Sequence, residues 1–245
     1  MKNNKVVLTY YYTGMMDKWH HKVFKKCDAS DFGTLYKSVK GRGYDFVTLA
    51  NELYPTDNKW KVVELSGYLA KPKDMSLYVH KFIACYEWLK KHPEYEEIWI
   101  VDSADTEMLS TPKPEEDKIY TGYDAFFPEF DRNVNFYWFL GGVRYGVGIP
   151  QHFGLGSRHG EMETMYLKTM YPDELAYNCG VFGGKRKIVM EFLEKLADRL
   201  KKNDIDLEMV VFNYLVYTQY KDNTEVCTTR MTLCEKDYNK WWRHK

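Results

Sequence analysis

The sequence predicts an α/β fold in which helices flank a mainly parallel central sheet. Through the first 110 residues, short β-prone apolar runs alternate with segments of helical periodicity, which is the pattern of a doubly wound sheet. An acidic pair, Asp102 and Asp105, follows the apolar run over residues 97–101. Ligands of such sheets bind beyond the carboxyl ends of the strands, so the pair lies where this fold would form a site.

Strands of the first half are expected wherever an apolar, β-branched or aromatic run is bounded by turn-forming residues. These runs span residues 5–12, 44–49, 60–65 and 97–101. The apolar stretch of the first run is short and is broken by tyrosines, which indicates a strand rather than a signal peptide.

Two helices are expected between these strands. The first spans residues 31–40, with Ser30 as its N-cap and Gly41 at its end. The second begins after Asp74, its expected cap, and ends before Pro93. Apolar residues recur along it at helical spacing and predict a buried stripe. The stripe consists of Met75, Val79, Phe82, Ile83, Tyr86 and Leu89.

The second half is expected to contain an aromatic strand over residues 133–140 and then a loop over residues 141–160 with seven glycines. Loops of this length in a compact domain are usually functional. Helices are expected over residues 161–170, 187–201 and 206–220, and strands over residues 175–184 and 225–233. The tail, Trp241-Trp242-Arg243-His244-Lys245, is aromatic and basic and is a candidate, with the loop, to close over a ligand.

Composition limits the class of function. Lys+Arg and Asp+Glu both number 35, so the formal net charge is zero and a nucleic-acid partner is not expected. No apolar run reaches the length of about 18 residues that a membrane span needs. The scattered cysteines, without a CxxC pair, predict reduced thiols in a cytoplasmic protein. The Lys-, Asn- and Tyr-rich composition suggests an AT-rich genome of viral or bacterial origin.

The acidic pair carries the first candidate chemistry. Asp102 and Asp105 are three residues apart at the end of a strand, so both carboxylates can face one cavity across a turn and hold a hard divalent cation. The alternative is that one of them only caps the turn that follows.

Two further segments fit the same chemistry. Glycines flank the short apolar run in Asn178-Cys179-Gly180-Val181-Phe182-Gly183-Gly184, which lets the backbone approach a ligand, or simply turns the strand into the next helix. Glu208 lies in the first turn of a helix expected to be capped by Asp206, where it either faces the site or only complements the helix dipole. Arg158, with Lys185 and Arg186, could neutralise a diphosphate, although the last two are equally compatible with exposed charges at a helix start.

Taken in order, these segments resemble the GT-A glycosyltransferases, the nucleotide-diphospho-sugar transferase fold. The segment over residues 101–105 resembles the acidic metal motif of that family, the segment over residues 178–184 its N-x-G-x-x-G-G strand, and the segment over residues 208–215 its D-x-x-x-x-N-Y-L helix. The resemblance implies one Rossmann-like domain over residues 1–245, with a nucleotide-binding half over 1–110 and a sugar- and acceptor-binding half over 111–245.

The resemblance also implies an activity. The chain would be a glycosyltransferase that moves a hexose or pentose from a UDP- or GDP-linked donor to a glycan or glycoconjugate acceptor. Asp102 and Asp105 would bind Mn²⁺ or Mg²⁺, with His244, near the C-terminus, as the candidate third ligand, and Glu208 and Asp105 would be catalytic. The implied donor-binding residues are Thr9, Tyr10, Tyr11, Asp102, Asn178, Gly180, Gly183, Asn213 and Arg158.

The chain departs from the family pattern in two respects. Its acidic motif is DxxD where DxD is commoner, and Glu208 stands where an aspartate is more usual. It lacks the acidic cluster typical of many inverting members, which favours a retaining enzyme. Two alternatives stay open: an inactive carbohydrate- or nucleotide-sugar-binding protein, and an unrelated metal-dependent phosphoryl-transfer hydrolase.

Overall fold

The described part of the chain is a set of ranges separated by gaps. The computed structural model describes residues 3–14, 16–17, 22–23, 32–52, 60–66, 75–103, 105–123, 158–171, 174, 176–202, 208–230 and 240–244. The expected aromatic strand over residues 133–140 and the glycine-rich loop up to residue 157 lie outside these ranges, as do Ser30, Asp74 and Asp206.

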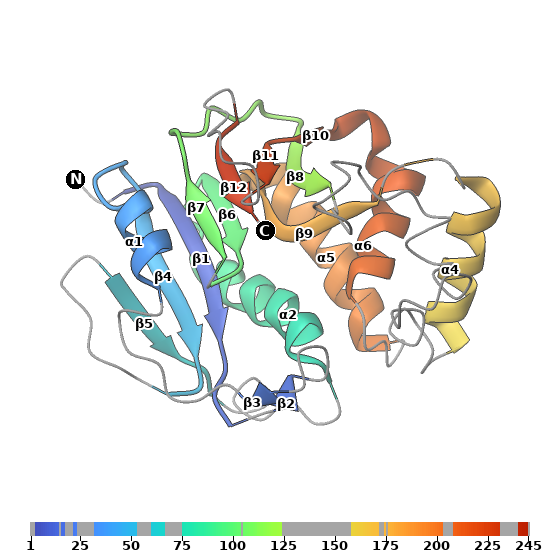
Figure 1. Cartoon of the computed structure of the whole chain (residues 1–245), viewed down its shortest axis with the longest axis horizontal. Coiled ribbons are helices and arrows are strands. Elements are labelled where there is room, and N and C mark those ends of the chain that lie inside the picture. Colours follow the sequence, from blue (N-terminus) through green and yellow to red (C-terminus); the bar gives the residue numbers. More distant parts are fainter. Residues whose placement is uncertain are drawn as a thin grey trace.

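A seven-stranded sheet forms the centre of the described residues (Figure 1). Its strands are β1 Lys5–Tyr11, β4 Asp45–Ala50, β5 Trp60–Glu64, β6 Glu97–Val101, β8 Ile119–Tyr123, β9 Tyr177–Lys185 and β10 Thr224–Val226. They lie in the order β10-β8-β9-β6-β1-β4-β5, and β9 runs antiparallel to both its neighbours while the other pairs are parallel. The predicted α/β fold with a mainly parallel mixed sheet is confirmed, and the arrangement is compatible with a Rossmann-like fold.

One face of the sheet packs against three helices, α2 Leu77–Lys90, α5 Arg186–Lys202 and α6 Glu208–Leu215. Alternate side chains of a strand point to the same face, so Val6 and Leu8 of β1 both enter this core. Its centre is a group of phenylalanine rings with centroids 5.0 to 6.4 Å apart. The group consists of Phe82, Phe182, Phe192 and Phe212. Burial of this apolar surface is the main force that fixes the helices on the sheet.

The other face packs against helix α1 Gly33–Val39 and a small three-stranded sheet. The strands of that sheet, in the order β11-β12-β7, are β11 Thr228–Arg230, β12 Trp242–His244 and β7 Thr106–Met108. The rings of Trp99 on β6 and Trp242 on β12 are fully buried, with centroids 5.6 Å apart. The C-terminal end of the chain therefore lies in the middle of the molecule, packed on the central sheet (Figure 1).

Short elements complete the described residues. Strand β2 Met16–Asp17 pairs antiparallel with β3 Lys22–Val23. Helix α4 Arg158–Met170 packs against α6 and buries Leu167. Helix α6 continues into a π-helical turn, η5 Val216–Tyr220, and a 3-10 turn, η6 Lys221–Asn223.

The helices and strands predicted for the first half lie within two residues of their predicted ends, but the predicted helix caps are wrong. Helix α2 is capped by Ser76 rather than Asp74, because the Ser76 hydroxyl accepts a hydrogen bond of 3.3 Å from the Val79 N–H. Helix α1 is preceded by Phe32, which has no capping group. Gly41 ends that helix as predicted, and its φ of +85° is a conformation that favours glycine.

The second half differs more from the expectations. Helix α5 is confirmed, but β9 continues through Gly183 and Gly184, so these glycines form no turn. The segment expected to form one strand over residues 225–233 forms two in its described part, because β10 and β11 belong to different sheets. The change occurs at Cys227, whose N–H donates to Thr121 of β8 while its carbonyl accepts from the Trp242 N–H. In the described residues 240–244 the tail packs on the central sheet, because Trp242 is fully buried in the core.

Two expectations from composition find support in the described residues. No helix there combines the length and the apolar character that crossing a membrane requires. Cys85, Cys179 and Cys227 are free, buried thiols.

Candidate metal centre

The carboxyl edge of the sheet brings the three predicted site segments together. Strand β1 lies between β4 and β6, which makes it a switch point of the winding, and ligands of doubly wound sheets bind beyond the strand ends at such a point. Tyr11 ends β1 and Asp102 follows β6 at this edge. Because β9 runs antiparallel, its first residues, Asn178 to Gly180, reach the same edge.

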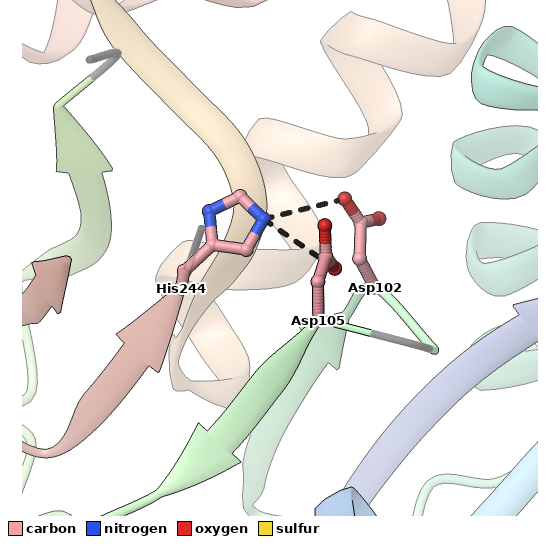
Figure 2. Close-up of side chains that lie close together, drawn as sticks. All are labelled: Asp102, Asp105 and His244. Carbon is pink, nitrogen blue, oxygen red and sulfur yellow. Dashed lines mark ion pairs between the residues drawn. The ribbon is translucent and has the colours of Figure 1, made fainter. Parts of the chain in front are cut away.

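Asp102, Asp105 and His244 form a compact group there (Figure 2). One ligand atom of each lies within 4.8 Å of the others. The His244 Nε2 atom is 3.6 Å from Asp102 Oδ2 and 3.8 Å from Asp105 Oδ1. The imidazole is buried and both carboxylates are partly exposed. Carboxylate oxygens and an imidazole nitrogen are ligands that Mn²⁺ accepts, so the group could hold a divalent cation.

Backbone pairing places these three side chains. The Asp102 N–H donates to the Gly180 carbonyl at 2.8 Å, which ties the end of β6 to β9. The Thr106 hydroxyl donates to the Asp102 carbonyl at 2.6 Å and closes the turn that contains Asp105. Strand β12 then pairs antiparallel with β7, with His244 opposite Thr106. The histidine from the C-terminal end of the chain thus comes to lie beside the acidic turn.

Gly180 lies directly beside the side chains of His244 and Asp102. A Cβ atom at this position would lie 2.2 Å from His244 Cε1, 2.3 Å from His244 Nε2 and 2.7 Å from Asp102 Oδ2. The Asn178 side-chain carbonyl accepts a hydrogen bond of 2.7 Å from the Gly180 N–H and holds this backbone in place. Gly180 and Asn178, both predicted to contact the donor, therefore also form the support of the cluster.

Lys81 is a member of the site that sequence reasoning missed. It lies on α2, is 4% exposed, and its Nζ is 2.7 Å from Asp102 Oδ1. A signal was available in the sequence, because Lys81 falls on the same helix face as Leu77 and Ala84, both buried. A lysine on a buried helix face needs a partner, and here that partner is Asp102.

The charges of the site act on one another. Burial alone would raise the pKa of Asp102, but the positive charge of Lys81 and the contact with His244 hold this pKa below its ordinary value. Burial would lower the pKa of His244, but the carboxylates of Asp102 and Asp105 raise it above its ordinary value. A cation at this group would have to displace the proton that these carboxylates favour on His244.

Glu208 lies behind the cluster, in the first turn of α6. Its side chain is 4% exposed, and its Oε1 accepts a hydrogen bond of 3.5 Å from the Cys179 thiol. Its Oε2 has no hydrogen-bond partner among the described residues. Burial raises the pKa of Glu208 to about 7 even though the charge of Lys81 acts to lower it. At neutral pH this carboxyl is partly protonated, so Oε2 can donate as well as accept a hydrogen bond.

Two predicted donor-binding residues make their contacts inside the protein. Asn213 is fully buried, and its amide accepts from the Tyr177 N–H at 2.7 Å and donates to the carbonyls of Tyr177 and Met209 at 2.9 Å. A Cβ atom on Gly183 would lie 2.4 Å from the Ile98 carbonyl, so the glycine lets β9 pack on β6. Both positions have structural reasons for their residue types.

The predicted nucleotide-contacting end of β1 is largely buried. Thr9 is fully buried in the centre of the sheet. The Tyr10 hydroxyl lies 2.7 Å from His80 Nδ1 on α2. Tyr11 is half-buried, on the opposite face, with its ring 5.2 Å from that of Phe32. Of these three residues, Tyr11 is the one that keeps substantial exposure.

The predicted basic residues lie apart from the cluster or cannot be placed beside it. In the backbone pairing of β9 with β6, Lys185 lies opposite Glu97, at the other end of β6 from Asp102. The prediction that Lys185 neutralises a diphosphate is therefore wrong. The same prediction for Arg186 is also wrong, because its guanidinium donates to the carbonyls of Leu89, His92 and Tyr95 near the end of α2. Arg158 is the first residue of α4 rather than part of the loop, and its side chain is outside the described residues.

No protein-family model and no curated protein matches the chain.

Proposed function

We propose that the chain is a metal-dependent glycosyltransferase of the GT-A type, which moves a sugar from a nucleotide-diphosphate donor to a glycan or glycoconjugate acceptor. The observation that carries the proposal is the group formed by Asp102, Asp105 and His244. It lies at the carboxyl edge of a mainly parallel sheet, beside the switch point where such sheets bind ligands. The sequence resemblance to the family supplies the substrate class.

The residues present fit a divalent cation. They offer two carboxylate oxygens and one imidazole nitrogen, and the absence of a Cβ at Gly180 leaves the space that these side chains occupy. The imidazole favours Mn²⁺ over Mg²⁺. Three protein ligands leave coordination positions for phosphate oxygens.

Each residue then has a role in transfer. A bound cation supplies electrostatic stabilisation of the negative charge that develops on the departing diphosphate. Asp102, Asp105 and His244 hold that cation at the end of β6. Lys81 contacts one oxygen of Asp102 at 2.7 Å and leaves the other for the cation. Glu208, with one oxygen that has no partner among the described residues, holds a hydroxyl of the donor sugar.

The test is turnover with a panel of UDP- and GDP-linked sugars in the presence of Mn²⁺. We expect release of the nucleoside diphosphate and sugar transfer with one donor. Asp105→Ala should abolish turnover and leave the fold intact, whereas Asp117→Ala, which removes an exposed carboxylate elsewhere, should not change turnover. Near-normal activity of Asp105→Ala would contradict the site. Tight donor binding without turnover would favour a binding protein, and metal-dependent cleavage of a phosphodiester would favour a phosphoryl-transfer hydrolase.

A further inference from the structure

Lys81 and Asp102 form an ion pair that differs from the surface pairs of this chain. The Lys81 side chain is 5% exposed and the Asp102 side chain 29%, while Lys90, on the same helix, is 50% exposed where it meets Glu87 at 3.4 Å. Water screens the Lys90 pair but reaches Lys81 hardly at all, so the charge of Lys81 acts on its neighbours at nearly full strength.

The two oxygens of Asp102 face different partners. Oδ1 accepts the hydrogen bond from Lys81 Nζ at 2.7 Å, and Oδ2 faces His244 Nε2 at 3.6 Å. Asp105 lies on the His244 side, with Oδ1 3.8 Å from the same nitrogen. A cation held by these three residues would face Oδ2 of Asp102, because Oδ1 already accepts a hydrogen bond from the Lys81 ammonium group.

We propose that Lys81 is a positioning residue that competes with the divalent cation for Asp102 and restricts this carboxylate to one ligating oxygen. The proposal rests on the metal site of the proposed function and adds a control on its affinity and selectivity. Two positive charges share one carboxylate, and their repulsion weakens the hold on the cation. Ca²⁺, which takes bidentate carboxylates readily, loses more from the restriction than Mn²⁺ does.

The test is a Mn²⁺ titration of the full chain, followed by the electron paramagnetic resonance signal of free Mn²⁺, with Ca²⁺ as competitor. We expect Lys81→Met to bind Mn²⁺ at least about ten-fold more tightly than the wild type, because a nearby positive charge is removed. The affinity for Ca²⁺ should increase by a larger factor still. Lys81→Arg keeps the charge and should stay within about three-fold of the wild type. Lys90→Met, the matched control on the same helix, should change neither affinity.

A merely structural role for Lys81 predicts the opposite sign, since a disturbed site binds metal less well. Folded Lys81→Met with unchanged or weaker Mn²⁺ affinity would therefore overturn the proposal. If Lys81→Met does not fold, Lys81→Gln carries the same expectation, because it keeps a hydrogen-bond donor without the charge. Failure of every variant and of the wild type to bind Mn²⁺ would overturn the metal site itself, whereas normal Mn²⁺ binding that is insensitive to Lys81 would overturn this inference alone.

Discussion

At the residue scale, the candidate metal cluster of Asp102, Asp105 and His244 depends on a position that must lack a side chain. A Cβ atom added to Gly180 would lie within 2.7 Å of His244 and Asp102, two of the three candidate ligands. The role of Gly180 at the site is thus to leave room as well as to support the backbone. Gly33, by contrast, has no atom within 4 Å of an added Cβ and does not have a positive φ.

Gly180→Ala should weaken Mn²⁺ binding by at least about ten-fold, because the new methyl group pushes His244 and Asp102 apart, at a stability cost of about 1–3 kcal/mol. A calorimetric Mn²⁺ titration and urea unfolding measure the two effects. Gly33→Ala should leave Mn²⁺ affinity unchanged. Unchanged affinity in Gly180→Ala as well would show that the cluster has more room than the structure gives it.

Glu208 links the site to the pH dependence of stability. Its pKa is about 7 in the folded chain and ordinarily 4.5. Between these values the unfolded chain loses the proton while the folded chain keeps it, so this group lowers stability as the pH rises through that window.

Glu208→Gln cannot ionise in either state. The variant's free energy of unfolding, relative to that of the wild type, should therefore increase as the pH rises from about 4 to about 8. The total increase should be up to about 3 kcal/mol. Urea unfolding of wild type and variant across this range measures the difference, with Glu115→Gln, which changes an exposed carboxyl, as the control. A difference that does not vary with pH would mean that Glu208 titrates normally.

A local signal was enough to predict that Asp102 and Asp105 lie close together. Asp102 and Asp105 follow an apolar run, and the cluster contains both. Lys81 was missed because its partner is distant in the sequence, although its place on a buried helix face was a local signal. The sequence predicts that Asn213 contacts the donor. Its amide instead joins α6 to the start of β9, a contact that only the tertiary fold reveals.

At the element scale, the site depends on the three-residue strand β12. Its pairing with β7 puts His244 opposite Thr106, and Trp242 anchors the strand in the core against Trp99. Strands β7 and β12 were not predicted, because runs this short become strands only when a partner is beside them. The longer elements, whose periodicity covers several turns or an entire buried strand, were predicted within two residues in the first half.

Trp242→Ala should destabilise the chain by about 3–5 kcal/mol, as expected for a fully buried tryptophan. It should also weaken Mn²⁺ binding, because β12 carries His244. Trp242→Phe keeps most of the packing and should lose less than half as much stability. A loss below about 1 kcal/mol in Trp242→Ala would contradict a core role for this strand.

At the scale of the whole molecule, one antiparallel strand in a mainly parallel sheet assembles the site. Because β9 runs against β6, the segment that begins at Asn178 reaches the same edge as Asp102, and α6 then places Glu208 behind both. The order of these segments along the chain was readable from the sequence. Their convergence at one edge required the strand order, which no local pattern encodes.

The most direct test of a cation site that carries a nucleotide diphosphate is thermal unfolding with a panel of UDP- and GDP-linked sugars, with and without Mn²⁺. Ligand that binds only the folded chain raises the melting temperature by mass action. We predict a rise with one donor that requires Mn²⁺ and is lost in both Asp105→Ala and His244→Ala. No rise with any donor, or a rise of the same size without Mn²⁺, would contradict the account.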